Sequence, residues 1–391
     1  MEIQTSDKVT RARALADKIK IKVAGLEGDL ADANETLASG YFKGTRTALS
    51  QMPTGGIYRK AVYGNGVYVA VSTSSAVYAT ENRNWTRSLS MGGSTTTFTD
   101  VAFGNGVFVV VSDYTDKIYQ SVDGTTWSTV YSSDMELGRV YFHDKAFICF
   151  PSEGSNLSSV LVSNNGKNWT KKTVSSNGGQ SITGTLTYDE YTKVFYRGFG
   201  GSLMSSTDGL SWNKKSSIFN GTNKHTSVLL AGEGNVLYFD WGYGDYETAL
   251  SKDGGATWKV ISTSNVLLSN TGNRGIYANK KFHIPDNYSS SDRIIVFDLD
   301  GDYVEVEIPD GADIYNVSYV NGDFIYLAHS NDNKTYYSLD GYGLSDNTGT
   351  NILVDVHAVN RTGEVMRWLH GVPETTLQSA YREGVNAYIG E

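Results

Sequence analysis

Aromatic and short polar side chains gather in several loops of this sequence, and together they could form a binding surface. The candidate binding residues are Tyr114, Trp241, Tyr243, Tyr246 and Tyr288. An aromatic ring offers a flat apolar face, and neighbouring Asp, Asn and Ser groups can hydrogen-bond, which suits recognition of a sugar or a protein. Ordinary solvated loops can have the same composition, so the sequence leaves that alternative open.

The sequence shows no residue pattern that is typical of catalysis or of metal binding. The six histidines, at positions 143, 225, 283, 329, 357 and 370, show no metal-ligand spacing. Asp298–Asp302 is acidic and turn-like, but Pro309 stands where a calcium loop has its last glutamate. Cys149 lies in an apolar run and is expected to be a small buried residue. We therefore expect no catalytic residues, no metal and no cofactor.

A turn motif that ends in tryptophan repeats along the chain. Its copies are Ser121–Trp127, Asn164–Trp169, Thr207–Trp212 and Ser251–Trp258, with a less regular copy at Thr80–Trp85. Tryptophans therefore recur at 85, 127, 169, 212 and 258, and two later Asp-Gly turns, at Leu299 and Leu339, continue the series. Asp-Gly between alternating apolar residues is a hairpin signal, and a period in the forties accommodates four short strands.

A second hairpin motif precedes each of these turns. Tyr63-Gly-Asn-Gly-Val-Tyr-Val69 recurs as Phe103-Gly-Asn-Gly-Val-Phe-Val109, and looser versions bring the number of copies to seven. Each unit thus reads as four antiparallel strands, A to D, that cannot bury both faces alone. Radial packing of the units solves this problem and predicts an all-β, seven-bladed β-propeller over residues 57–359.

The tryptophan turns resemble the Asp-box (BNR) repeat of sialidase-like propellers. Ser251–Trp258 matches that pattern in full, whereas Asn165 stands where an aspartate is usual. In that family the box lies on the turn between strands C and D, away from the ligand face. The resemblance therefore implies a structural role for Asp123, Trp127, Trp169, Asp208, Trp212, Asp253 and Trp258.

A sialidase-like glycosidase is the enzymatic alternative that the resemblance suggests. That family has an arginine triad whose first member lies in a Phe/Tyr-Arg-Ile-Pro motif, and this chain has only Tyr58-Arg59 of it. Arg197 and Arg274 are candidates for the other two arginines by blade order alone. Because no pair of carboxylates stands out either, we expect a protein that is not an enzyme.

Segments outside the repeats differ in character. Residues 1–40 predict a helix for oligomerisation or docking, because apolar residues from Leu15 to Leu37 step by three or four. Residues 41–56 read as a linker, and residues 360–391 as a helical tail with a short helix over 363–370 and a second from Pro373. Either residues 41–56 or residues 351–358 could supply a strand that closes the ring.

Charge and hydropathy narrow the expected partners. The net charge of −9 disfavours nucleic acid, and no apolar run is long enough to span a membrane. The start of the chain lacks the apolar core of a secretory signal, so we expect synthesis and retention in a cytoplasm, or release by lysis. Taken together, the chain resembles bacteriophage tail, fibre or baseplate proteins.

This resemblance implies a homo-oligomeric virion protein. The terminal segments would contact other virion subunits, and the propeller would bind a host-surface glycan or protein. A cellular propeller scaffold or assembly factor is the alternative.

Overall fold

The computed structural model divides the chain into two compact units, Met1–Thr47 and Ala48–Glu391. The structure describes residues 52–53, 56–80, 85–90, 97–113, 116–152, 157–177, 184–199, 201–218, 226–241, 246–261, 274–286, 293–307, 314–321, 323–328, 335–338, 345–346, 356–359 and 365–368. The predicted N-terminal helix, the second helix of the tail and the last Asp-Gly turn lie outside these residues. The described part is all-β.

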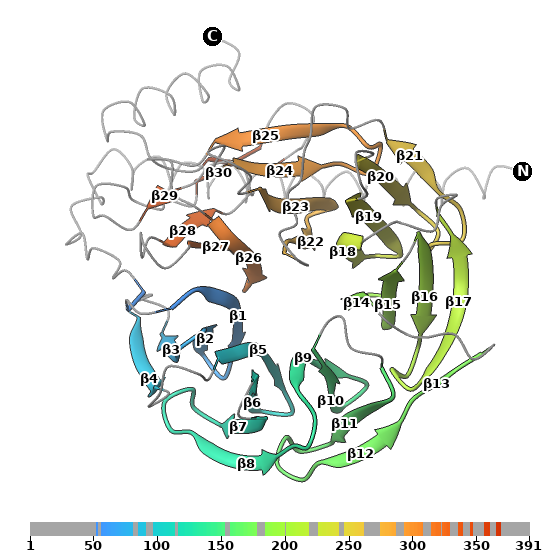
Figure 1. Ribbon diagram of the computed structural model, residues 1–391. Helices are drawn as coiled ribbons and strands as arrows, with labels where there is room; N and C mark the ends of the chain where they lie inside the picture. The colour runs from blue at the N-terminus through green and yellow to red at the C-terminus, as the bar shows by residue number, and fades with distance from the viewer. Residues whose placement is uncertain are drawn as a thin grey trace, which may run out of the picture. The chain divides into compact units, whose positions relative to one another are not determined.

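Antiparallel sheets follow one another along the second unit (Figure 1). The first sheet contains β1 (Tyr58–Gly64), β2 (Val67–Ser72), β3 (Ser75–Ala79) and β4 (Thr86–Ser90). The second contains β5 (Thr97–Gly104), β6 (Val107–Asp113), β7 (Lys117–Ser121) and β8 (Ser128–Ser132). The third contains β9 (Leu137–His143), β10 (Ala146–Pro151), β11 (Ser159–Ser163) and β12 (Thr170–Thr173).

The fourth sheet contains β13 (Ser175–Ser176), β14 (Thr185–Asp189), β15 (Val194–Phe199), β16 (Ser202–Ser206) and β17 (Ser211–Ser217). The fifth contains β18 (Thr226–Gly232), β19 (Asn235–Trp241), β20 (Tyr246–Ser251) and β21 (Lys259–Ile261). The next contains β22 (Ile276–Ala278), β23 (Lys281–Asp286), β24 (Arg293–Phe297) and β25 (Tyr303–Glu307). The last of this series contains β26 (Ile314–Val320), β27 (Asp323–Ala328), β28 (Thr335–Ser338) and β29 (Ser345–Asp346).

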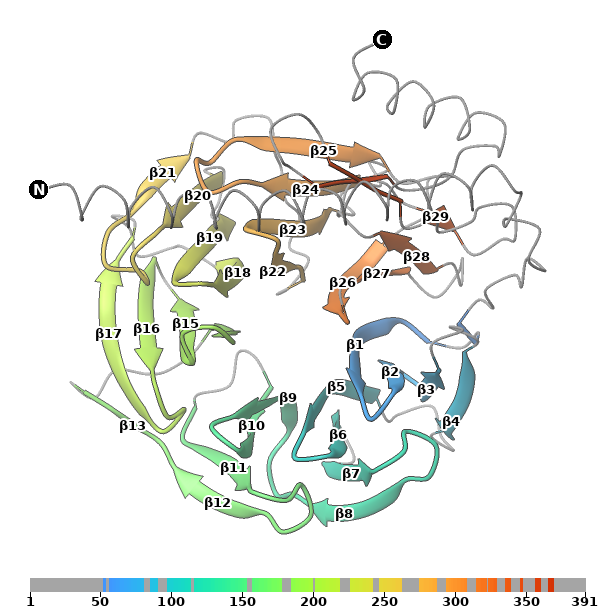
Figure 2. The same ribbon diagram turned by 180° about the vertical axis from the view of Figure 1, so that it is seen from behind.

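The predicted β-propeller is confirmed, but its seven uniform blades are not. Six of the described sheets are four-stranded blades of the expected pattern, whereas the sheet of β14–β17 has five strands. Its extra strand, β13, pairs in parallel with the outer strand β17. The strands nearest the middle of the ring are the first strands of the sheets: β1, β5, β9, β14, β18, β22 and β26 (Figures 1 and 2). We call them the inner strands.

Tight turns set the register of each sheet. Asn65 and Gly66 connect β1 to β2, and both have positive φ, 51° and 78°, which suits a two-residue hairpin. The turns between third and fourth strands lie at the same end of the ring as these hairpins. Asn65 Nδ2 shows this, because it donates both to Gly106 O, in the first hairpin of the next sheet, and to Val122 O, in the turn between the third and fourth strands of that sheet. We call this end of the ring the turn end, and the end where the inner strands begin the entry end.

The hydrophobic core lies between neighbouring sheets. Val69, Val71, Phe98 and Phe108, for example, form one buried cluster across the first two sheets. The ring closes in the same way, because Ile325 and Leu327 of β27 pack with Tyr58 and the first sheet. Of the two segments that could close the ring, residues 356–358 lie in β30 (Val356–Val359), which belongs to a separate two-stranded sheet, whereas residues 41–51 and 351–355 lie outside the described residues.

The tail requires a second correction. Residues 363–370 were expected to form a helix, but β31 (Val365–Trp368) is a strand that pairs with β30 (Val356–Val359). A short apolar run fits either structure, and pairing with a nearby strand decides for β. Met52 of the predicted linker is buried in the first sheet's cluster. The described part of the chain contains no helix that could cross a membrane.

Candidate binding site at the entry end

The residues expected to be structural lie in the turns between third and fourth strands. Asp123 Oδ1 accepts hydrogen bonds from Thr125 N and Thr126 N, both at 2.8 Å, and from Ser121 Oγ at 3.0 Å. The hydrogen bond from Thr126 N is the largest of the effects that hold the pKa of Asp123 well below its usual range. Asp208 and Asp253 repeat this arrangement.

The tryptophans of these turns connect neighbouring sheets. Trp127, Trp169 and Trp212 each donate Nε1 to the glycine carbonyl of their own turn at 3.1 Å. Trp258 donates Nε1 to Ser216 Oγ of the preceding sheet at 2.9 Å. Gly124, in the second sheet, lies so close to the first sheet that a Cβ would stand 2.7 Å from Val69 Cγ2. All these contacts stabilise the ring.

The loop residues expected to bind a ligand are only partly described. Trp241 ends β19 and Tyr246 begins β20, and the two residues are cross-strand partners. Tyr114, Tyr243 and Tyr288 lie outside the described residues. Their binding role stays a prediction.

A different set of seven residues, six of them polar, occupies one equivalent position in the inner strands at the entry end. Each residue stands four places before the last residue of its strand. The set is Lys60, Asp100, Arg139, Thr185, Val228, Arg274 and Asn316, where Arg274 precedes the start of β22. Three of the seven are cations and one is an anion, in a chain whose net charge is −9. We call these seven residues the entry ring.

Bulges accompany the entry ring. The register of β1, β5, β9, β18 and β26 with its neighbouring strand shifts just before this position. The extra residues are Arg59, Thr99, Gly138, Ser227 and Tyr315. A bulge bends a strand and re-aims its side chains, and bulges are frequent beside functional sites.

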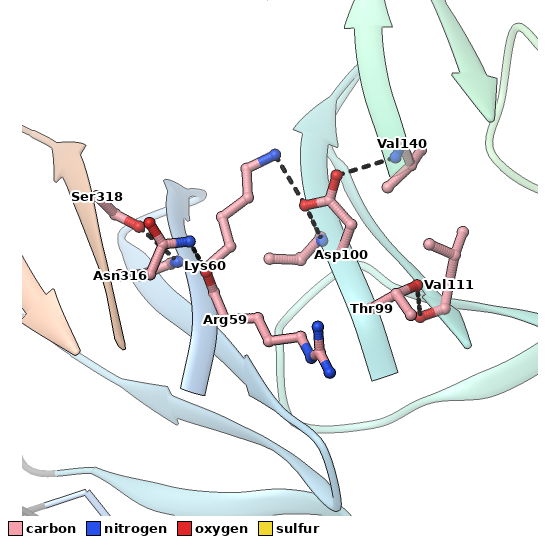
Figure 3. A network of polar contacts seen from close by, with 10 residues as sticks. Arg59, Lys60, Thr99, Asp100, Val111, Val140, Asn316 and Ser318 are labelled. Atoms are coloured by element: carbon pink, nitrogen blue, oxygen red, sulfur yellow. Dashed lines mark hydrogen bonds and ion pairs between the residues drawn. The ribbon is translucent and has the colours of Figure 1, made fainter. Parts of the chain in front are cut away.

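Asp100 joins the first three sheets at the entry ring (Figure 3). Its carboxylate, 1% exposed, accepts from Val101 N at 2.8 Å and from Val140 N at 3.0 Å. Lys60 Nζ lies 2.9 Å from Asp100 Oδ1 and 5.4 Å from the centroid of the Tyr141 ring. The charge of Lys60 is therefore held between a buried carboxylate and an aromatic face.

Asn316 performs a similar task where the last sheet meets the first. Its Oδ1 accepts from Val317 N at 2.8 Å and from Gly275 N at 3.1 Å, and its Nδ2 donates to Arg59 O (Figure 3). Ser318 Oγ accepts from Ala61 N at 3.0 Å. An amide thus joins three neighbouring sheets, as the Asp100 carboxylate does elsewhere in the ring.

Two arginines meet on one tyrosine at this junction. Arg274 Cζ lies 3.6 Å from the centroid of the Tyr315 ring, and Arg59 Cζ lies 5.8 Å from it. The Nε of Arg59 is buried and has no hydrogen-bond partner among the described residues. Two guanidinium groups on one ring form a concentrated cationic surface that suits an anionic group such as a carboxylate or a phosphate.

Arg197, the third arginine named from blade order, is placed differently. It lies on the second strand of its sheet, is 1% exposed, and donates Nε to Gly184 O at 2.9 Å. The structure therefore brings Arg59 and Arg274 together and gives Arg197 a buried position. Sequence reasoning missed the entry ring as a whole, although counting back from the repeated hairpin turns would have aligned its charged members. The described residues include no group of His, Cys, Asp and Glu side chains arranged to hold a metal.

Comparison with known proteins supports the fold. No family model and no curated protein matches the chain. Among solved structures, YCF48 bound to D1 peptide has a TM-score of 0.54 at 12% identity, covering 72% of this chain and 93% of that chain. YCF48 from Cyanidioschyzon merolae has a TM-score of 0.53 at 13% identity, covering 72% and 96% of the two chains.

An ancestral GH74 enzyme, AFV00434, is similar to the same degree. Its TM-score is 0.53 at 13% identity, and the match covers 82% of this chain and 49% of that chain. At these identities the likeness shows a shared β-propeller fold, which hosts many different functions.

Proposed function

We propose that the protein is a non-enzymatic structural component of a bacteriophage virion, in the tail, fibre or baseplate. Its propeller would bind an anionic group, on a host-surface glycan or protein or on a neighbouring subunit, at the entry end. The observation that carries the binding role is the pair of guanidinium groups, Arg59 and Arg274, on the Tyr315 ring. The virion setting is supported by the resemblance of the sequence, and the terminal segments 1–40 and 360–391 are the proposed contacts with other virion subunits.

The arrangement of the entry ring favours binding over catalysis. Glycoside hydrolysis commonly uses two carboxylates, one of which donates or accepts a proton. The carboxylate of the entry ring, Asp100, is already engaged by two backbone N–H groups and by Lys60. A carboxylate held in this way is committed to the fold rather than to proton transfer.

A binding experiment on the full chain tests the entry-end role. Saturable, salt-sensitive binding to host cells and to purified acidic surface glycans is expected, with no sugar released. Arg59→Gln combined with Arg274→Gln should weaken it about tenfold or more, because a charge-assisted hydrogen bond contributes roughly 1.5–3 kcal/mol. Lys171→Gln, an exposed lysine that pairs with Asp134 in the third sheet, is the matched control and should bind normally.

Three outcomes of this experiment separate the alternatives. Release of sugar would revive the sialidase-like glycosidase. Unchanged binding in the double variant would exclude the entry ring as the site. If the protein binds neither host cells nor the glycans, the result would favour a cellular or virion scaffold whose propeller contacts other proteins.

The virion setting has its own test. The protein should co-purify with phage particles in fixed stoichiometry, and a chain lacking residues 1–40 should fold, as judged by its melting temperature, without being incorporated. Normal incorporation of the shortened chain would contradict the proposed anchoring role.

A further inference from the structure

Aromatic rings occupy a second equivalent position of the inner strands, at the turn end. The residue before the last one of each inner strand is aromatic in six cases: Tyr63, Phe103, Phe142, Tyr188, Tyr277 and Tyr319. Three of these rings, Phe103, Phe142 and Tyr277, lie directly on a glycine of the preceding sheet. A Cβ on Gly104 would stand 2.1 Å from the ring of Phe142, and one on Gly232 would stand 2.0 Å from the ring of Tyr277.

Ala231, on β18, is the exception to this pattern. Strand β18 contacts both β14 and β22, so it lies between their sheets. Tyr191, in the turn that follows β14, makes an edge contact with Tyr277, with ring centroids 6.4 Å apart and ring planes at 85°. Rings from the two flanking sheets thus meet beside the one inner strand that lacks an aromatic residue here.

Tyr191 is unusually exposed for a large side chain. It is 59% exposed, whereas Tyr277 is 7% exposed and supports it from the side. Burying the face of an aromatic ring is favourable, and an exposed ring in an ordered turn is available to a partner. The turn itself is well defined, because Asp189 accepts hydrogen bonds from Tyr191 N, Thr192 N and Gly234 N.

Carboxylates surround the exposed ring. Tyr277 Oη donates to Glu233 Oε2 at 3.1 Å. Partial burial and then the charges of Glu233, Glu190 and Asp189 raise the pKa of Tyr191. Asp189 is committed to backbone N–H groups, but Glu190 and Glu233 are both exposed at the surface. The electrostatic environment of the Tyr191 ring is therefore negative.

We propose that Tyr191, Glu190 and Glu233 form a binding site for a lysine or arginine side chain of a partner protein, with the buried Tyr277 holding Tyr191 and Glu233 in position. The faces of tyrosine rings attract cations, and the attraction is strengthened when carboxylates stand beside the ring. An apolar partner would bury Glu233 without a counter-charge, which is unfavourable. Because this site lies at the turn end, it is independent of the anionic ligand proposed for the entry end.

Fluorescence anisotropy with a fluorescein-labelled tetra-arginine peptide tests the proposal on the full chain. The control peptide carries citrulline, which has nearly the shape of arginine without its charge, and it should bind much more weakly. Tyr191→Ala should weaken tetra-arginine binding about two- to fivefold, the range expected for one exposed cation–π contact, while Tyr191→Phe should keep it. Glu233→Gln should weaken binding up to about fivefold.

A charge-matched control separates this site from diffuse attraction to an acidic protein. Asp302→Asn removes one exposed carboxylate from a turn at the same end of the ring, and it should leave binding unchanged. Equal losses in Asp302→Asn and Glu233→Gln, or normal binding in Tyr191→Ala, would overturn the proposal. Unchanged melting temperatures of the variants show that they are folded. Arg59→Gln should bind tetra-arginine normally, so failure here and failure at the entry end are distinguishable.

Discussion

Replacing Asp100 by alanine is expected to lower the free energy of unfolding by about 3–5 kcal/mol. Val101 N and Val140 N would lose their acceptor, and both residues are fully buried. An unsatisfied buried N–H costs about 1–3 kcal/mol. The ion pair adds about 1 kcal/mol or less, because the side chain of Lys60 is 30% exposed and water weakens the attraction.

The matched control for this prediction is Asp100→Asn. Asp100 accepts from Val101 N through Oδ1 and from Val140 N through Oδ2, so an asparagine keeps an acceptor oxygen for only one of these two N–H groups. Asp100→Asn should therefore cost about 1–3 kcal/mol, less than Asp100→Ala, through the one buried N–H group that loses its acceptor and through Lys60.

Urea unfolding followed by tryptophan fluorescence measures both values, provided that the slope with denaturant is the same for the three proteins. A loss below 1 kcal/mol in Asp100→Ala would refute the reasoning. An equal loss in the two variants would show that the charge, rather than the hydrogen-bond acceptor, matters.

Three further predictions concern the turn end. Hydrogen bonds from Thr257 and nearby backbone N–H groups lower the pKa of Asp253 to about 2. The contribution of this carboxylate to stability is therefore present above pH 4 and is lost as the pH falls toward 2. In thermal melts, Asp253→Asn should lose less stability over that pH range than the native chain. Asn165→Asp should raise the free energy of unfolding at pH 7 by about 0.5–1 kcal/mol, because a carboxylate accepts the same N–H bonds more strongly, and an unchanged or lower melting temperature would contradict this. Gly104→Ala should cost about 1–3 kcal/mol in urea unfolding through its clash with Phe142, a cost that should shrink in a Phe142→Ala background.

Much of the propeller could be predicted because its signals are local and repeated. The Asn-Gly and Asp-Gly turns fix where each hairpin reverses, and the spacing of the tryptophans fixes the length of the unit. Strand β13 could not be predicted, since Ser175 and Ser176 have no alternating apolar pattern. Their pairing depends on Ser175 N and Asn177 N donating to Leu210 O and Trp212 O, which is a tertiary contact.

The candidate sites were harder to predict for a physical reason. Arg59 and Arg274 are distant in sequence, and they meet on Tyr315 only because the last sheet lies between the first sheet and the sheet of β22–β25. A bulge before Lys60 also breaks the alternation on which sequence reasoning about strands depends. The sequence could not single out Tyr191 as a binding residue, because its position matters only beside Ala231, the residue of the next sheet that replaces an aromatic ring.

The entry ring combines residues that hold neighbouring sheets together with a cation that we propose to contact a ligand. At equivalent positions, Asp100 and Asn316 satisfy buried backbone groups of neighbouring sheets, so their loss acts on stability. Arg274 stands at the same position, and its guanidinium lies on the face of Tyr315. A cation at the surface of an aromatic ring contributes only about 0.5–1 kcal/mol to stability. The anionic ligand proposed for the entry end would give the charge of Arg274 a role in binding beyond this contact.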